Sequence, residues 1–166
     1  QTFVGEGFFR IRNVGPISKA IFGIAYENFD EDIDQPRLVQ SSIFVDGKIE
    51  NYGIFGEVEI PITPKLVFIA GGRYEDDQRT RSLRTIAGFS GDNQGETELS
   101  SSGFAPKLGF RYDANNDLTV GYQFSDGWRA ARANFDFFRP DLGVVIFDRE
   151  RLRNHEAYAR SRFYDG

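Results

Sequence analysis

The sequence predicts an all-β fold, an antiparallel up-and-down transmembrane β-barrel. Three observations support this prediction. Apolar side chains recur at every second residue, as they do when only one side of a strand faces an apolar environment. Short and long connections alternate between the segments that show this pattern. The 166 residues also include 17 Phe, 7 Tyr and 18 Gly, a composition typical of strands and tight turns.

Seven segments show the alternation, and each predicts a strand. In the first two, the charged side chains fall on one side of the strand. The four middle segments each have an apolar, uncharged side, and the last has only a weakly apolar one. The expected strands cover residues 2–12, 19–29, 52–60, 66–75, 104–113, 118–125 and 154–164. Alternation places six large apolar side chains of the middle strands on one face of the sheet: Leu66, Phe68, Leu108, Phe110, Val120 and Tyr122.

The connections between these strands alternate in length. Residues 13–18, 63–65 and 114–117 are short and rich in Pro, Asn and Asp, as tight turns require. Residues 30–51, 82–103 and 130–153 form connections of about 20 residues each, and we expect them to be long outer loops.

This arrangement is typical of a transmembrane β-barrel, in which lipid contacts the apolar face and the charged face lines a wet lumen. Aromatic residues near the strand ends are expected to form the interfacial girdles: Tyr52, Tyr74, Tyr112, Phe124 and Phe163. A soluble β-sandwich, with the apolar face as its core, is the alternative. Three long loops at one end favour the barrel, because such loops are uncommon in compact soluble domains.

The first long connection allows a second architecture. Residues 39–45 and 48–55 can be interpreted as a hairpin with Asp46-Gly47 as its type I′ turn. This hairpin would bring the strand count near eight, which is enough for a complete small barrel.

Composition excludes several other classes of protein. No apolar run approaches the 18 or so residues of a membrane-spanning helix. The chain has no Cys and a single His, His155, which excludes thiolate and multi-histidine metal sites and a cysteine nucleophile. A net charge of −5 argues against a general nucleic-acid binder.

Three candidate sites in the sequence have simpler explanations. His155 and Ser161 would lie about 20 Å apart on one strand, too far for a nucleophile and its base. Asp30, Asp32 and Asp34 alternate but lack the Gly and the later Glu of a calcium loop, so an acidic loop is expected there. Residues 91–95 are rich in Gly but no helix follows them, which argues against a phosphate-binding loop.

Beyond pattern, the sequences FAPKLGFRY (104–112) and LTVGYQFSDGWRA (118–130) resemble the barrel of TonB-dependent outer-membrane receptors. YGIFGE (52–57), ITPKL (62–66) and GGRYE (71–75) are similar to the hairpin that usually precedes these strands, and NHE (154–156) is similar to the start of the next. The resemblance covers residues 52–166. The sequence departs from the family pattern at Ala131, His155 and Tyr158.

The resemblance implies a 22-stranded barrel around a plugged lumen, of which residues 1–166 would form a single segment of about seven strands. The plug, the TonB box and the terminal strand are expected outside this segment. The resemblance further implies a receptor of the Gram-negative outer membrane. Such a receptor takes up a nutrient, with a ferric siderophore as the first expectation, and uses energy transmitted through TonB.

The partners implied are outer-membrane lipid and lipopolysaccharide, the rest of the barrel and its plug, TonB through that plug, and a small anionic ligand. We expect no enzymatic activity, no cofactor and no metal site. Two other hypotheses stay open at this point. One is a complete small barrel with a structural or adhesive role, and the other is an outer-membrane hydrolase that depends on His155.

The third long connection provides the candidate ligand-binding residues. Six Arg flank or occupy residues 128–153, with aromatic residues between them. Arg offers planar, bidentate contacts to carboxylate or phosphate, and aromatic rings offer stacking area. The loop could contact an anionic chelate or a lipopolysaccharide phosphate, or it could pack on itself. The predicted ligand-binding residues are Trp128, Arg129, Arg132 and Phe135.

Overall fold

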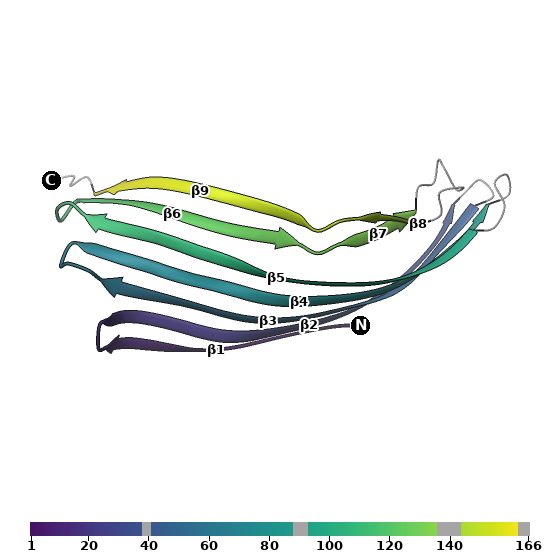
Figure 1. Cartoon of the computed structure of the whole chain (residues 1–166). Helices are drawn as coiled ribbons and strands as arrows, with labels where there is room; N and C mark the ends of the chain where they lie inside the picture. The colour runs from purple at the N-terminus through teal and green to yellow at the C-terminus, as the bar shows by residue number, and fades with distance from the viewer. Residues whose placement is uncertain (38–40, 88–92, 136–143, 163–166) are drawn as a thin grey trace.

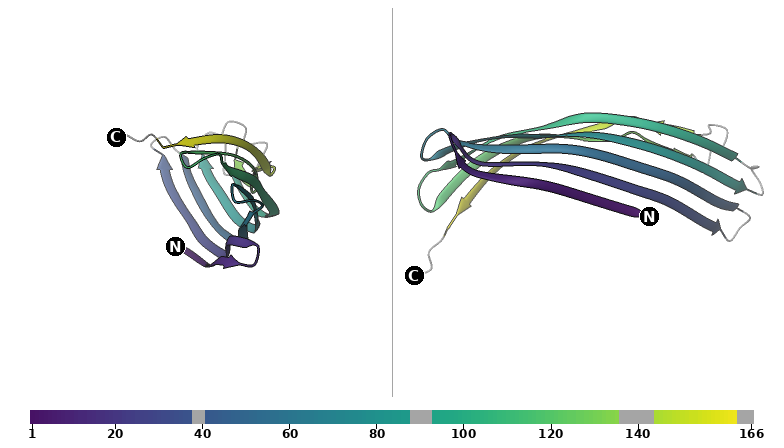
Figure 2. Two further views of the ribbon diagram at one scale, coloured as in Figure 1. Left: turned by 90° about the vertical axis from the view of Figure 1, so that its left-hand side faces the viewer. Right: turned by 90° about the horizontal axis from the view of Figure 1, so that it is seen from below.

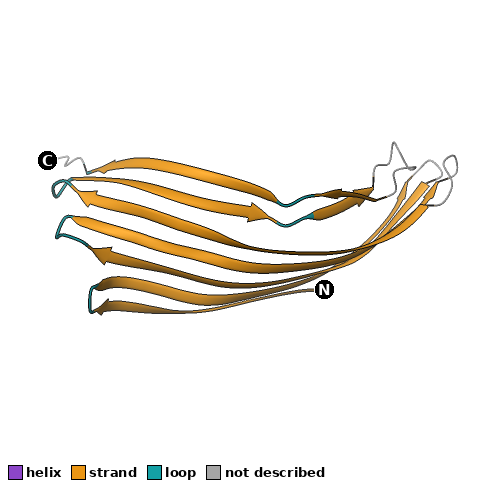
Figure 3. Cartoon of the chain, viewed as in Figure 1, coloured by secondary structure: helices purple, strands orange, loops and turns teal. Residues whose placement is uncertain are grey.

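The computed structural model describes residues 1–37, 41–87, 93–135 and 144–162. Seven strands form one antiparallel sheet in chain order, and two short strands form a separate hairpin (Figures 1 and 3). The sheet contains β1 (Thr2–Val14), β2 (Ile17–Arg37), β3 (Ser41–Pro61), β4 (Leu66–Ala87), β5 (Asn93–Asp113), β6 (Leu118–Arg129) and β9 (Glu150–Ser161). The hairpin contains β7 (Arg132–Phe135) and β8 (Val144–Phe147).

All seven predicted strands are present, and the predicted sharing of one face is confirmed. Phe68 pairs with Phe110, and Phe110 pairs with Tyr122, so the three side chains form one row across β4, β5 and β6. Leu66, Leu108 and Val120 fall on the same face by the same register. We call this the outer face. The opposite face, which carries Lys107 and Arg111, is the inner face.

The predicted long loops at residues 30–51 and 82–103 are wrong over most of their length. β2 and β3 stay paired up to Arg37 and Ser41, and β4 and β5 stay paired up to Thr85 and Asn93. Figure 2 shows β2 to β5 continuing as a curved, twisted sheet well beyond the N-terminal end of β1.

The apolar alternation stops before the strands do, and this explains the error. The nine residues of β3 from Tyr52 to Ile60 span about 30 Å, which a tilt of about 40° reduces to near the 25 Å of an outer membrane's apolar band. The full 21-residue strand reaches about 70 Å. Its remainder has no need of an apolar face, because both of its sides can meet water.

The alternative hairpin over residues 39–55 is also wrong. Asp46 and Gly47 lie inside β3, where they pair with Asp32 and Glu31 of β2. The predicted acidic loop at Asp30, Asp32 and Asp34 is therefore also a stretch of strand. Without the extra hairpin, the described residues form a sheet in which β1 pairs with β2 alone and β9 with β6 alone. This open sheet does not support a closed eight-stranded barrel.

Large apolar side chains are exposed along the outer face. Ile24 is 66% exposed, Ile54 60% and Phe104 58%, whereas the buried apolar residues that the structure describes are small: Ala20, Val45, Val67, Ala130 and Ala133. A β-sandwich would cover the apolar face with a second sheet. Here no second sheet of the described residues covers the apolar face, as is expected of a barrel wall that faces lipid. Across the described ranges, no helix is long and apolar enough to span a membrane.

The three short turns follow the predicted chemistry. Asn13 and Gly15 adopt positive φ angles of 55° and 57° at the turn between β1 and β2, a conformation that Asn and Gly tolerate best. Thr63 Oγ1 accepts hydrogen bonds from the backbone N–H groups of Lys65 and Leu66. Asn115 Oδ1 does the same for the turn that leads into β6.

Close approach of neighbouring strands explains one glycine of the inner face. A Cβ atom at Gly71 would lie 2.7 Å from the backbone oxygen of Gly56 and 3.2 Å from the Cα atom of Glu57. Backbone atoms within a paired sheet cannot move away as the end of a side chain can. Any larger residue at position 71 must therefore push β3 and β4 apart.

We expect Gly71→Ala to lower the free energy of unfolding by about 1–3 kcal/mol, the usual cost of overpacking. Urea unfolding of the intact protein in lipid vesicles measures this change. Gly7→Ala is the matched control, because a Cβ atom at Gly7 meets nothing within 4 Å. Equal stability of the two variants would show that the spacing of β3 and β4 is wrong.

Candidate functional site

The β7–β8 hairpin lies against the inner face of the long strands. Arg81 Nη1 of β4 donates a hydrogen bond of 3.1 Å to the backbone oxygen of Ala133, and Ser101 Oγ of β5 accepts one of 3.2 Å from the backbone N–H of Ala131. Ala133 is 5% exposed. Residues 130–153, predicted as a loop, therefore include a hairpin attached to the sheet. A pattern of four-residue strands is too short to predict from the sequence.

A cavity of about 480 Å³ lies between this hairpin and the sheet. The sheet contributes Glu31, Gly47, Lys48, Ile49, Arg79, Thr80, Arg81, Thr97 and Leu99, and the hairpin contributes Arg132, Ala133 and Phe147. Its lining residues include three Arg, one Lys, one Glu, two Thr and one Phe. This mixture suits a small ligand that carries both polar anionic groups and apolar surface. We call it the hairpin cavity.

Ion pairs fix two of the three guanidinium groups of the hairpin cavity. Arg81 Nη2 lies 3.2 Å from a carboxylate oxygen of Glu31. Arg79 makes two hydrogen bonds to Asp77, of 2.6 and 3.0 Å, and the Asp77 side chain is only 4% exposed. Arg132 differs, because its guanidinium lies 5.7 Å from the centre of the Phe147 ring. That cation–π contact leaves the N–H edges of the guanidinium able to bind an anion.

Titration of nearby groups follows these contacts. Hydrogen bonds to Asp77 raise the pKa of the Arg79 guanidinium above its already high value. The hydrogen bond between Lys48 and Glu50 raises the pKa of the ammonium and lowers the pKa of the carboxyl. These groups lie beyond the apolar band, and they stay charged near neutral pH.

The predicted ligand-binding residues do not form one cluster. Arg132 lines the hairpin cavity. Trp128 packs against Gly103 and lies 5.9 Å below the guanidinium of Arg149. Arg129, whose side chain is 64% exposed, forms an ion pair of 3.2 Å with Glu150.

Phe135 belongs to β7, but its side chain lies outside the described residues, as do Phe137, Phe138 and Arg139. The contacts of Trp128 and Arg132 show that the third connection packs partly on itself. Arg132 nevertheless also faces the hairpin cavity.

Sequence reasoning missed Glu31, Arg79 and Arg81. The predicted strands ended at residues 29 and 75, so these three residues were expected in or near loops. One signal could have found two of them: Arg79 and Arg81 continue the parity of Arg73, Glu75 and Asp77 on the inner face. The contribution of Phe147 depends on the hairpin, for which the sequence has no comparable signal.

The family can now be identified. Residues 2–166 match the model of the TonB-dependent receptor-like β-barrel. The chain belongs to this family. Receptors of the family are proteins of the Gram-negative outer membrane.

A solved structure agrees with this assignment. The ferric yersiniabactin uptake receptor FyuA from Yersinia pestis superimposes with a TM-score of 0.72 at 15% sequence identity. The match covers 99% of this chain and 28% of the FyuA chain, so this chain spans little more than a quarter of that receptor. At this identity the likeness shows the fold of the receptor barrel.

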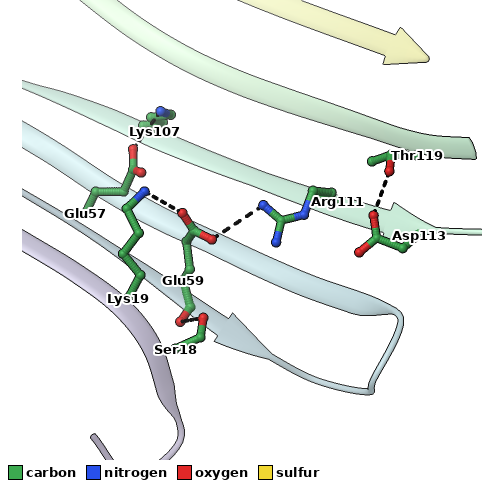
Figure 4. Close-up of polar contacts among 8 residues, drawn as sticks. All are labelled: Ser18, Lys19, Glu57, Glu59, Lys107, Arg111, Asp113 and Thr119. Carbon is green, nitrogen blue, oxygen red and sulfur yellow. Dashed lines mark hydrogen bonds and ion pairs between the residues drawn. The ribbon is translucent and has the colours of Figure 1, made fainter. Parts of the chain in front are cut away.

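Ion pairs also cross the inner face of the receptor barrel near the short turns (Figure 4). Glu59 of β3 lies 2.7 Å from Lys19 of β2 and 3.5 Å from Arg111 of β5. Lys107 and Glu57 form a second pair of 2.6 Å. The inner face is thus charged along its length, as a water-filled or plugged lumen requires.

Two other features of the receptor barrel are poor ligand sites. The ring nitrogen Nδ1 of His155 lies 2.7 Å from the Tyr122 hydroxyl on the outer face, so the single His has an aromatic partner there. A hollow of about 880 Å³ lies over outer-face residues such as Phe22, Ile54 and Gly72. It is almost wholly apolar and offers nothing to bind a charged ligand.

Among the described residues, no three carboxylate or His side chains are placed to hold a metal ion.

Arg81 holds the hairpin of the receptor barrel in place, so we expect Arg81→Gln to loosen it. Loss of the bonds to Ala133 and Glu31 should reduce the free energy of local opening by about 1.5–3 kcal/mol, the usual range for charged hydrogen bonds. Hydrogen exchange of backbone amides 132–135 and 144–147 measures this opening. Arg84→Gln, an exposed residue of the same strand, should leave exchange unchanged. Unaltered exchange in Arg81→Gln would contradict the anchoring role.

Proposed function

We propose that this chain is a single segment, residues 1–166, of the barrel domain of a receptor in a Gram-negative outer membrane. Its role is nutrient uptake and not enzymatic catalysis. Membership of the TonB-dependent receptor family supports this proposal. The plug would occupy the charged inner face, and TonB would act on the receptor through that plug.

The substrate that we propose is a small anionic chelate, a ferric siderophore. The hairpin cavity is the main support. It lies on the inner face beyond the apolar band, where a ligand arriving from outside would first meet the lumen. FyuA, which shares the fold, takes up ferric yersiniabactin.

Arg132 is the residue best placed to contact this ligand. Its guanidinium borders the cavity and is stacked on Phe147, whereas Arg79 and Arg81 are held by carboxylates. No carboxylate of the described residues pairs with Arg132, so a ligand carboxylate or phenolate could accept two of its N–H groups. Trp128, Arg129 and Phe135 remain proposed contacts. Trp128 and Arg129 do not line the cavity, and the side chain of Phe135 lies outside the described residues.

We expect Arg132→Gln in the intact receptor to weaken binding of its ferric siderophore by about 2 kcal/mol, from the loss of charge-assisted hydrogen bonds. Equilibrium titration with a panel of ferric siderophores, ferric yersiniabactin among them, measures the effect. Arg84→Gln is the matched control, because the register places Arg84 on the outer face, away from the cavity.

Two outcomes would contradict the proposal. If no ferric siderophore of the panel binds the folded receptor, the substrate class is wrong. If Arg132→Gln binds as tightly as the control, the ligand does not occupy the hairpin cavity.

A further inference from the structure

The outer face changes from apolar to polar at one level across the sheet. The last apolar or aromatic residues before the change include Tyr26, Tyr52, Tyr74 and Phe104. The next outward positions are Asn28, Glu50, Asp76, Ser102, Asp126 and Arg153, and several of them are cross-strand partners. Aromatic girdles mark the membrane–water interface of outer-membrane barrels. The positions above the girdle therefore lie at the level of lipid headgroups.

Above the girdle, the charge of the outer face differs between β2 to β5 and β9. Over β2 to β5, the acidic residues that the register places on the outer face are Asp30, Asp32, Asp34, Asp46, Glu50, Asp76, Glu96 and Glu98. Lys48 and Arg84 are the basic residues on the same part of the outer face. On β9, by contrast, alternation from His155 places Arg153 and Arg151 on the outer face. Arg149 comes just before this strand.

Contacts with β5 and β6 hold two of these arginines, Arg151 and Arg149, in place. Arg151 Nη2 lies 2.7 Å from a carboxylate oxygen of Asp126, whose side chain is 7% exposed, while the Arg151 side chain is itself 54% exposed. Arg149 Nη1 donates a hydrogen bond to the backbone oxygen of Ser102. Asp126 is the one acidic residue at the outer-face positions of β6 and β9, so the patch of three arginines stays positive.

Below these arginines the outer face is suited to acyl chains. Ala157 and Ala159 follow His155 along β9, and Tyr122 and Val120 are their partners on β6. A lipid with an anionic headgroup therefore matches this surface, because its headgroup would lie against the arginines and its acyl chains against the apolar residues below them. Over β2 to β5, the same headgroup would meet repulsive carboxylates.

We propose that Arg151 and Arg153 bind the phosphate groups of an outer-leaflet lipid, whose acyl chains lie on β6 and β9. Guanidinium groups suit this role because they pair with phosphate in a bidentate manner. The binding fixes lipid on one side of the segment. This inference rests on the outer-membrane location proposed above, but it is independent of the ligand in the hairpin cavity.

Lipid A, a glycolipid with two phosphate groups, is the probe for this site. We expect it to bind the intact, detergent-solubilised receptor and to bind the variant R151Q/R153Q about 30-fold more weakly. This change corresponds to about 2 kcal/mol, or about 1 kcal/mol for each surface arginine. Native mass spectrometry over a series of lipid concentrations measures the affinity. Dephosphorylated lipid A should bind the wild type and the variant equally and weakly.

The matched control is R84Q, which removes a positive charge from the acidic part of the same face and should keep the wild-type affinity. A loss in R84Q as large as that in R151Q/R153Q, or equal binding of both lipid forms to the wild type, would overturn the proposal. If R151Q/R153Q does not fold, R153Q alone serves, because it leaves the Arg151–Asp126 pair intact. It should weaken binding about fivefold, and an unchanged affinity would also overturn the proposal.

Siderophore binding by R151Q/R153Q should equal that of the wild type, because Arg132 belongs to the inner-face site. A receptor that binds lipid A but no siderophore would refute the proposed substrate and leave the lipid site standing. Fractionation of bacterial membranes tests the outer-membrane location separately.

Discussion

Antiparallel pairing with alternating side chains is the constraint on which this structure depends. Each long strand bonds its backbone to its neighbours, so its side chains must divide between two faces. A shift of one residue in any register would exchange the two faces of that strand, so that within the apolar band its charged residues would face outward and its apolar residues inward. Phe68, Phe110 and Tyr122 lie on one row because no strand has slipped.

The same constraint carries the sheet beyond the apolar band. Backbone pairing between β2 and β3 continues from Tyr26 and Tyr52 to Arg37 and Ser41, although the outer face there is no longer apolar. Continued pairing brings Glu31, Arg79 and Arg81 to the inner face, where they can hold the β7–β8 hairpin. The hairpin cavity is thus a product of strand length as much as of loop sequence.

The sequence alone predicted the features that produce an alternation of apolar and polar residues. The seven strands near the apolar band, the three short turns and the shared face of Leu108 and Val120 all follow from the period-two pattern. Strand ends were not predictable in this way, because pairing above the band has no apolar face to reveal it, and Asp46-Gly47 resembles a turn while lying in a strand. The hairpin cavity depends on contacts such as Arg81 to Ala133, between residues 52 positions apart, and local pattern cannot show them.

The division of the two faces is tested most directly by an accessibility scan along β5. This chain contains no cysteine, so single cysteines at positions 104 to 113 of a cysteine-free intact receptor can each carry a spin label in lipid vesicles. Even-numbered positions should be relaxed by lipid-soluble oxygen, and odd-numbered positions by a water-soluble nickel complex or, where the plug covers them, by neither. Oxygen accessibility without a period of two, or with maxima at the odd positions, would contradict the assignment of the outer face to the membrane.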